Sequence, residues 1–294
     1  MGMLPLGILH RLGKWVARSV FFLWKKRRNV ILENLRLAFG SRLDQKEMDR
    51  LYYGFLANMG RGSMEALALR SLPDRFFHNI EVTGLDHLDE ALKKGKGVIA
   101  VSAHLGNFAL IGRKLSLLGY RFNYLVRNPH NRWSERMFRW LGETGGVKLI
   151  PDKPKNLCLK RSIECLKNGE ILFILSDVSA LSGGIDVDFF GHQVPTFKGP
   201  VTLSMRSGAA LLPMFIVWDG KGGQKIIIEP SLPLTREGRL EEDIRKTTAH
   251  IAKLVEGYIE KYPAQWWWIH RRWKRRRKKE TDRMTQDLSQ GNLS

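Results

Sequence analysis

Residues 97–110 read GVIAVSAHLGNFAL, an apolar run that ends in a histidine and an asparagine. The apolar part is typical of a strand buried on both faces, and the segment after His104 has helical spacing as far as Leu118. His104 therefore follows directly on a predicted strand. Ligands and catalytic groups collect at the carboxyl ends of strands in open α/β sheets, so His104 is a candidate for chemistry. A histidine there can act as a general base towards an alcohol, although it could also only cap the strand or helix.

Strands and helices alternate on the C-terminal side of this stretch. Before it, we expect helices over 29–40 and 44–70, the second beginning with a capping pair of Asp44 and Glu47. This pattern predicts an α/β fold in which a central mixed sheet is flanked by helices, with an N-terminal helical segment. We predict further strands at 121–126, 147–150, 170–176, 186–190, 210–217 and 224–229, and further helices at 131–142, 155–167, 199–207 and 240–261.

Residues 1–28 predict a basic amphipathic helix. His10, Arg11, Lys14 and Arg18 fall on one face, apolar residues that include Trp15 fall on the other, and four cations follow at 25–28. Such a helix lies in a membrane interface, with its cations on anionic head groups. The alternative is an ordinary surface helix packed on the domain. We divide the chain into this helix, a domain at 29–274 and a basic, polar tail at 275–294.

The charge of the chain points to a polyanionic partner. The 294 residues include 49 Lys and Arg against 29 Asp and Glu, a net charge of +20, and fifteen of the basic residues lie in 1–28 and 271–279. A membrane surface, a nucleic acid or an acidic protein would suit such ends. The run Trp266–Trp268, followed by HRRWKRRRKK, favours an interfacial anchor, since no nucleic-acid fold signature accompanies it. The alternative places at least one of these tryptophans in the core.

Other classes of protein are excluded or disfavoured. Cys158 and Cys165 have no histidine at metal-ligand spacing, so we expect no metal and a reducing compartment. The longest stretch without a charged residue, 97–112, is too short and too polar to span a bilayer. The sequence contains neither a nucleophile elbow, a P-loop nor a dinucleotide fingerprint, which disfavours a serine hydrolase and nucleotide-dependent chemistry.

The sequence resembles the lipid A biosynthesis (late) acyltransferases and related bacterial lysophospholipid and glycolipid acyltransferases over about residues 25–275. Each matching motif is weak alone, but their shared order and spacing are specific. The motifs are RRNVILENLRLAFG (27–40), the helix around Asn58, Gly60 and Glu65, SAHLGNF (102–108), YLVRNPHN (124–131), LKNGEILFILSD (166–177), VDFFG (187–191), GPVTLSMRSGAALLPMF (199–215) and YPAQWWWIHRRWK (262–274).

This resemblance implies a glycerolipid-acyltransferase-like fold and transfer of an acyl group to a hydroxyl of a membrane lipid. The donor would be acyl carrier protein or acyl-CoA, with no other cofactor. His104 matches the family's base, and Asp177 matches the acid that ends a strand. Asn107, Arg127 and Lys153 would bind substrate, the two cations through a phosphate or the thioester oxygen. The implied place is the cytoplasmic face of the inner membrane of a Gram-negative-type bacterium, with anionic lipids, acidic acyl carrier protein and a lipid acceptor as partners and no nucleic acid.

Two positions depart from the family pattern. The family's acid falls five residues after the histidine, where this chain has Ala109, and Val178 stands where a glutamine is common. The acid normally orients the imidazole and stabilises its protonated form. Either another carboxylate reaches His104, with Asp177 the first choice and Glu65 the second, or the chain is an impaired homologue that retains lipid binding. We favour the active enzyme.

Overall fold

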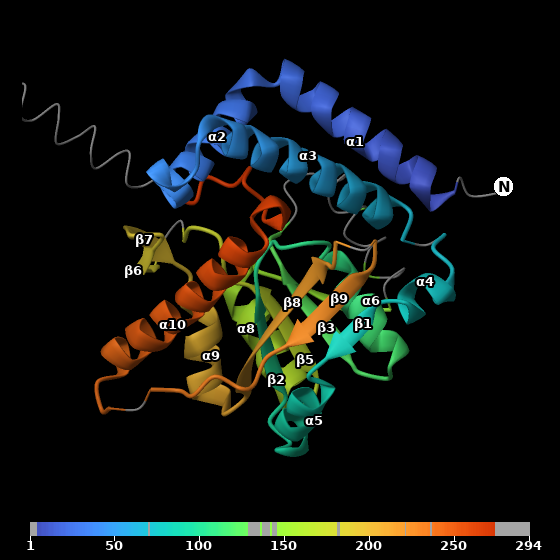
Figure 1. Ribbon diagram of the computed structural model, residues 1–294. Helices are drawn as coiled ribbons and strands as arrows, with labels where there is room; N and C mark the ends of the chain where they lie inside the picture. The colour runs from blue at the N-terminus through green and yellow to red at the C-terminus, as the bar shows by residue number, and fades with distance from the viewer. Residues whose placement is uncertain are drawn as a thin grey trace, which may run out of the picture.

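The computed structural model describes residues 5–69, 71–128, 136, 142, 146–180, 183–220, 222–235 and 237–273. Most of the helix predicted at 131–142, and the whole tail at 275–294, lie outside the described residues. Figure 1 shows a sheet covered by helices, with three N-terminal helices gathered at one end of the molecule.

The central sheet has seven strands in the order β1-β9-β8-β2-β5-β3-β4. The five strands from β8 to β4 run parallel, whereas β9 is antiparallel to β8 and parallel to β1. The predicted α/β fold with a central mixed sheet is confirmed. The strands are β1 (Glu81–Thr83), β2 (Val98–Ser102), β3 (Phe122–Val126), β4 (Lys148–Pro151), β5 (Ile171–Leu175), β8 (Ala210–Trp218) and β9 (Gln224–Ile228).

Strand β2 lies in the middle of this sheet, and all five of its residues are buried. Its side chains alternate between two hydrophobic clusters, with Val98 and Ala100 on one face and Ile99 and Val101 on the other. The first cluster is completed by α4 (Asp74–His78), α5 (Leu85–Lys93) and α6 (Ala109–Leu117), and the second by α8 (Lys155–Lys167), α9 (Gly199–Ser207) and α10 (Leu240–Lys261).

A third cluster is built largely outside the sheet. It joins α1 (Leu6–Leu23), α2 (Lys25–Phe39) and α3 (Gln45–Leu67) to α10 and to a two-stranded hairpin. Helix α3 begins with the expected capping box, because Asp44 and Glu47 each accept a hydrogen bond from the other's backbone amide. The hairpin consists of β6 (Ile185–Phe189) and β7 (His192–Thr196).

Helix α1 packs against α3 through its smallest residues. A Cβ added to Gly13 would lie 2.3 Å from the carbonyl oxygen of Gly60, so the two backbones touch. The outer face remains apolar and open, with Trp15 70% and Leu23 79% exposed. The helix is therefore packed on the domain and also presents the apolar surface that a membrane interface requires. The boundary expected at residue 28 falls inside α2.

The expectation for the tryptophan run is wrong for two of its three members. After α10, the chain makes a short 3₁₀ turn, η2 (Pro263–Gln265), and re-enters the protein. Trp266 and Trp268 are fully buried, and their ring centroids are 4.7 Å apart. Since buried indoles cannot lie among lipid head groups, this segment belongs to the core.

Candidate active site

The site is built at the carboxyl ends of two neighbouring strands. In the parallel pair β2 and β5, Ser102 lies opposite Leu175, and the ladder continues through a bond from Ser176 N–H to the Ser102 carbonyl at 2.8 Å. Two residues beyond these paired positions, each strand is followed by one side chain of the site. His104 follows β2, and Asp177 follows β5. The adjacency of the strands therefore brings together two residues that are 73 positions apart in sequence.

His104 and Asp177 form two hydrogen bonds. His104 Nδ1 lies 2.8 Å from Asp177 Oδ1, and the backbone N–H of His104 donates to Oδ2 at 2.9 Å. The ring therefore has Nδ1 engaged with the carboxylate, and Nε2 is the nitrogen outside that pair. This is the arrangement in which a carboxylate fixes the tautomer of a histidine whose other nitrogen exchanges a proton.

Asp177 is kept ionised by its donors. Its side chain is fully buried, and Trp266 Nε1–H donates a third hydrogen bond to Oδ2 at 2.7 Å. Burial by itself would raise the pKa of Asp177, but His104 as a charge and hydrogen-bond partner, with His270 nearby, holds the pKa well below its usual range. A permanent negative charge therefore lies against the His104 ring.

The C-terminal segment pairs with the turn that carries His104. Gly106 N–H donates to the Gln265 carbonyl and Trp267 N–H to the His104 carbonyl, each at 3.0 Å. Gly106 has φ +57°, and a Cβ there would lie 2.2 Å from the Ile216 carbonyl oxygen, so only glycine fits. The turn is thereby held between β8 and the residues that follow α10.

A second histidine, which the sequence pattern did not single out, lies beside His104. The ring centroids of His104 and His270 are 4.5 Å apart, and Trp267 stacks on His270. Burial, with smaller effects of the neighbouring charges, lowers the pKa of His270 to about 4. His270 falls within YPAQWWWIHRRWK, so the motif pointed to it, but that stretch was interpreted by its tryptophans and cations.

A buried arginine secures the loop after Asp177. Arg272 donates to the carbonyl oxygens of Val178 and Pro195, both at 3.1 Å, and to Thr196 Oγ1 at 2.6 Å. Burial lowers the pKa of Arg272 to about 10. The guanidinium thus ties the loop that carries Asp177 to strand β7.

The two predicted substrate-binding cations lie at the same edge of the sheet. Arg127 follows β3 and Lys153 follows β4, and both are exposed. The ends of these strands are joined by a hydrogen bond from Asn128 N–H to Asp152 Oδ1 at 2.7 Å. Arg127 is near enough to lower the pKa of His270. Both side chains are exposed at the edge of the sheet where His104 and Asp177 lie.

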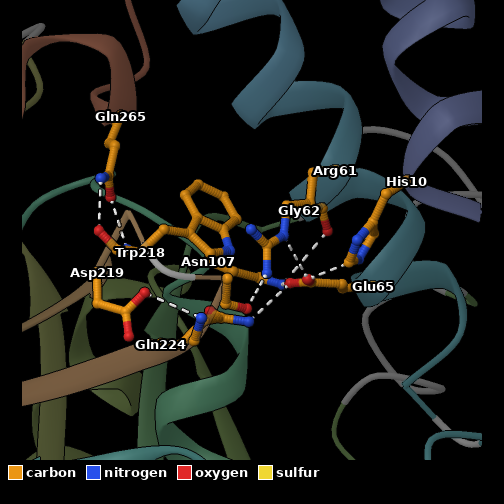
Figure 2. Close-up of polar contacts among 11 residues, drawn as sticks. His10, Arg61, Gly62, Glu65, Asn107, Trp218, Asp219, Gln224 and Gln265 are labelled. Atoms are coloured by element: carbon orange, nitrogen blue, oxygen red, sulfur yellow. Dashed lines mark hydrogen bonds and ion pairs between the residues drawn. The ribbon is translucent and has the colours of Figure 1, made fainter. Parts of the chain in front are cut away.

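Asn107 and Glu65 are placed differently from the expectation. Asn107 is buried, and its amide nitrogen donates to Glu65 Oε2 at 2.9 Å, so this placement does not support direct substrate binding (Figure 2). Glu65 does not take the part of the alternative acid. Its carboxylate is held by His10, Arg61, Asn107 and Gln224, while Asp177 holds the His104 ring.

Ala109 occupies the first turn of α6, with no group that could orient an imidazole. In this chain the carboxylate beside His104 comes from the neighbouring strand. Within the described part of the chain, no three His, Cys, Asp or Glu side chains are grouped so as to hold a metal ion.

Comparisons with known proteins show which family this chain belongs to. The profile of the bacterial lipid A biosynthesis acyltransferase family matches residues 1–275. The lipid A biosynthesis lauroyltransferase of Escherichia coli K12 is 29% identical over 286 residues, which cover 93% of this chain and 87% of the relative. The palmitoleoyltransferase of lipid A biosynthesis from the same organism is 27% identical over 277 residues, with equal coverage. A phosphatidylinositol mannoside acyltransferase of Mycobacterium tuberculosis is 27% identical over 198 residues, 65% of this chain and 59% of the relative. The chain therefore belongs to the bacterial lipid A biosynthesis acyltransferase family and is an acyltransferase.

Proposed function

We propose that the protein transfers a fatty acyl group from acyl carrier protein, or from acyl-CoA, to a hydroxyl of a lipid A precursor or a related membrane glycolipid. The observation that carries this proposal is the His104–Asp177 pair, at the edge of the sheet where Arg127 and Lys153 are also exposed. The names of the relatives support the substrate class, since two act in lipid A biosynthesis and one on a phosphatidylinositol mannoside.

His104 is the general base in this mechanism. Its Nε2 takes the proton of the acceptor hydroxyl as the oxygen attacks the thioester carbonyl carbon. The carbon–sulfur bond then breaks, the ester forms, and the imidazolium returns the proton to the departing thiolate. Asp177 stabilises the imidazolium through its bond to Nδ1. Arg127 and Lys153 supply positive charge for a substrate phosphate or for the thioester oxygen as charge develops on it.

Helix α1 supports a position of this site at a membrane surface. Its exposed apolar side chains include Trp15 and Leu23, and cations at 25–28 follow directly. Aromatic and apolar groups enter the interface while cations bind anionic head groups, so the helix fits a peripheral position on the cytoplasmic face of the inner membrane. Among the helices in the described part of the chain, none combines the length and apolar composition needed to cross a bilayer.

The test is transfer of a radiolabelled acyl group from acyl carrier protein to a lipid A precursor in mixed micelles. We expect His104→Ala and Asp177→Asn each to lower kcat on the order of a hundredfold or more, the range for a lost general base. His250→Ala and Asp186→Asn are matched controls, because both side chains are exposed and away from the pair, and they should keep wild-type kcat.

Circular dichroism should show that every variant is folded. Wild-type transfer that survives both site substitutions would contradict the role of the pair. If the wild type transfers no acyl group from either donor to any lipid acceptor, the proposed reaction is wrong. The impaired homologue suggested by Ala109, a membrane lipid-binding protein, then takes its place.

A further inference from the structure

Glu65 lies at the centre of a buried polar cluster that the proposed reaction does not use. The residue belongs to α3, its side chain is fully buried, and each carboxylate oxygen meets two partners (Figure 2). Oε1 lies 2.9 Å from His10 Nε2 and 3.1 Å from Arg61 Nε. Oε2 accepts hydrogen bonds from Asn107 Nδ2 at 2.9 Å and from Gln224 Nε2 at 3.0 Å.

The carboxylate in this cluster is ionised. Burial would raise the pKa of Glu65, but the contacts with His10, Asn107 and Arg61 outweigh it and lower the pKa below the usual value. A buried charge persists in a protein only when its partners replace the lost water. The cluster therefore depends on a negative charge at this position and not only on the shape of the side chain.

The partners of Glu65 come from separate parts of the fold. His10 is on α1, Arg61 is on α3 itself, and Gln224 is on β9. Asn107 lies in the turn between β2 and α6, three residues after His104. One carboxylate thus joins the N-terminal helix to the turn that carries the proposed base.

The same turn is held from its other side. Gly106 N–H donates to the Gln265 carbonyl, and the Gln265 side chain bonds both the N–H and the carbonyl of Trp218. Arg61 lies over the Trp218 ring at 5.1 Å from its centroid. The turn is therefore fixed between the Glu65 cluster and the segment after α10, and each support can be removed separately.

We propose that Glu65 is a positioning residue for acyl transfer, joining α1 to the His104 turn so that the packing of the membrane-facing helix sets the position of the base. This inference rests on the proposed function. It assigns Glu65 no proton transfer, since Asp177 holds the His104 ring. A substitution on the face of α1 that packs against α3 should therefore displace the His104 turn through two side chains, His10 and Glu65.

The first experiment compares Glu65→Gln with Glu47→Gln, which makes the same chemical change on the exposed start of α3. Glutamine at position 65 keeps the shape of the side chain but replaces one carboxylate oxygen with an amide NH2 group. This donor then faces the N–H donors of the cluster. We expect kcat to fall on the order of tenfold to a hundredfold, since small displacements of a reacting group carry losses of that size. KM for the acyl donor, and the dependence of kcat on pH, should stay as in the wild type. Glu47→Gln should keep wild-type kcat, because glutamine also completes a capping box.

The second experiment tests the contact between His10 and Glu65. His10→Ala removes the contact with Glu65, whereas Ser19→Ala changes an exposed side chain elsewhere on the same helix. In mixed micelles, His10→Ala should lower kcat in the same direction as Glu65→Gln, and Ser19→Ala should leave kcat unchanged. Equal losses in both variants would show that the effect does not pass through the Glu65 contact and would overturn the inference.

Hydrogen exchange gives a readout that does not depend on activity. In Glu65→Gln and His10→Ala, the amides of residues 104–107 should exchange faster than in the wild type, while those of β2 should be unchanged. Unchanged exchange in this turn, or a loss of activity explained entirely by the unfolded fraction, would overturn the positioning role. If the wild type shows no acyl transfer, the proposed function fails, and the exchange data still decide whether Glu65 holds the turn.

Discussion

At the scale of single residues, Asp177 is a fully buried carboxylate with three hydrogen-bond partners. Its oxygens accept hydrogen bonds from the His104 backbone N–H and from the Trp266 indole, and Oδ1 lies 2.8 Å from His104 Nδ1. The carboxylate has no exposure to solvent. A hydrogen bond to a charged acceptor contributes more than one to a neutral carbonyl. The two buried tryptophans allow this difference to be measured, because Trp266 donates to the carboxylate and Trp268 donates to the carbonyl of Pro263.

We therefore expect Trp266→Phe to lower the free energy of unfolding by about 1.5–3 kcal/mol through the lost bond, and Trp268→Phe by about 1 kcal/mol. Urea denaturation measures both values. Only Trp266→Phe should also reduce kcat, since only its indole touches the carboxylate that holds His104. Equal destabilisation by the two substitutions, with equal activity, would contradict this assignment.

His270 predicts a dependence of stability on pH. The folded state lowers its pKa from 6.5 to about 4, through burial first and then through His104, Arg27 and Arg127, against the opposing Asp177. As the pH falls from 6.5 towards 4, the unfolded chain binds a proton that the folded chain does not, so stability decreases. The full effect is about 3 kcal/mol. His270→Phe should remove this part of the slope in urea denaturation at pH 7, 5.5 and 4, and parallel curves for wild type and variant would refute it.

The sequence suggested Asp177 as the first choice for the acid that reaches His104, and the structure confirms this contact, but the sequence could not establish it. Strands β3 and β4 come between β2 and β5 in the chain, and hydrophobic patterns do not reveal the order of strands in a sheet. For the same reason Glu65 remained an open alternative as the acid. His270 was missed because its importance depends on a long-range contact with His104.

At the scale of elements, the contact between Gly13 and Gly60 sets the distance between α1 and α3. A Cβ on Gly60 would lie 2.2 Å from the Gly13 carbonyl oxygen, and a backbone atom cannot give way as a side chain can. We expect Gly60→Ala to separate the helices and to lower the free energy of unfolding by about 1–3 kcal/mol, the usual range for overpacking.

Gly257→Ala is the matched control on α10, because an added Cβ there meets nothing within 4 Å. It should be neutral or stabilising by up to about 1 kcal/mol, the helix preference of alanine over glycine. Limited proteolysis within α1 should become faster in Gly60→Ala alone. Equal cleavage rates in the two variants would show that the helices do not touch here.

Long, strongly periodic elements were predictable. The helix expected at 44–70 is α3, with its Asp44–Glu47 cap, and the strand in residues 97–103 is β2. Short elements were not, because β1 has three residues, α4 has five, and β7 belongs to a two-stranded hairpin outside the central sheet, so each is decided by its neighbours. The buried tryptophans were misread for a similar reason, since composition alone does not distinguish an interfacial indole from one in the core.

At the scale of the whole molecule, the net charge of +20 and the apolar face of α1 predict two separable contributions to membrane binding. Binding to anionic vesicles should weaken as salt rises, because ions screen the attraction of the cations. Trp15→Ala should weaken binding by about tenfold at low and high salt alike, since its contribution is burial of apolar surface.

Sedimentation with phosphatidylglycerol vesicles and with phosphatidylcholine vesicles measures both contributions. Leu240→Ala is the control, because Leu240 is also exposed, at 66%, but lies on α10. It should bind as the wild type does. Loss of binding in Leu240→Ala equal to that in Trp15→Ala would show that α1 is not the contacting surface.

The pairing of the last described segment with the His104 turn has a consequence for synthesis on the ribosome. Asn34 Nδ2 donates to the carbonyl oxygens of Trp268 and His270, 234 and 236 residues away, and Trp266 supplies a donor to Asp177. A nascent chain holds His104 and Asp177 long before Trp266 leaves the exit tunnel. Until then the carboxylate lacks its indole partner, and α2 lacks the segment it binds. The segment that carries Trp266 must therefore leave the tunnel before the centre is complete, and a chain that stops before this segment carries the histidine and its acid without the indole that binds the carboxylate.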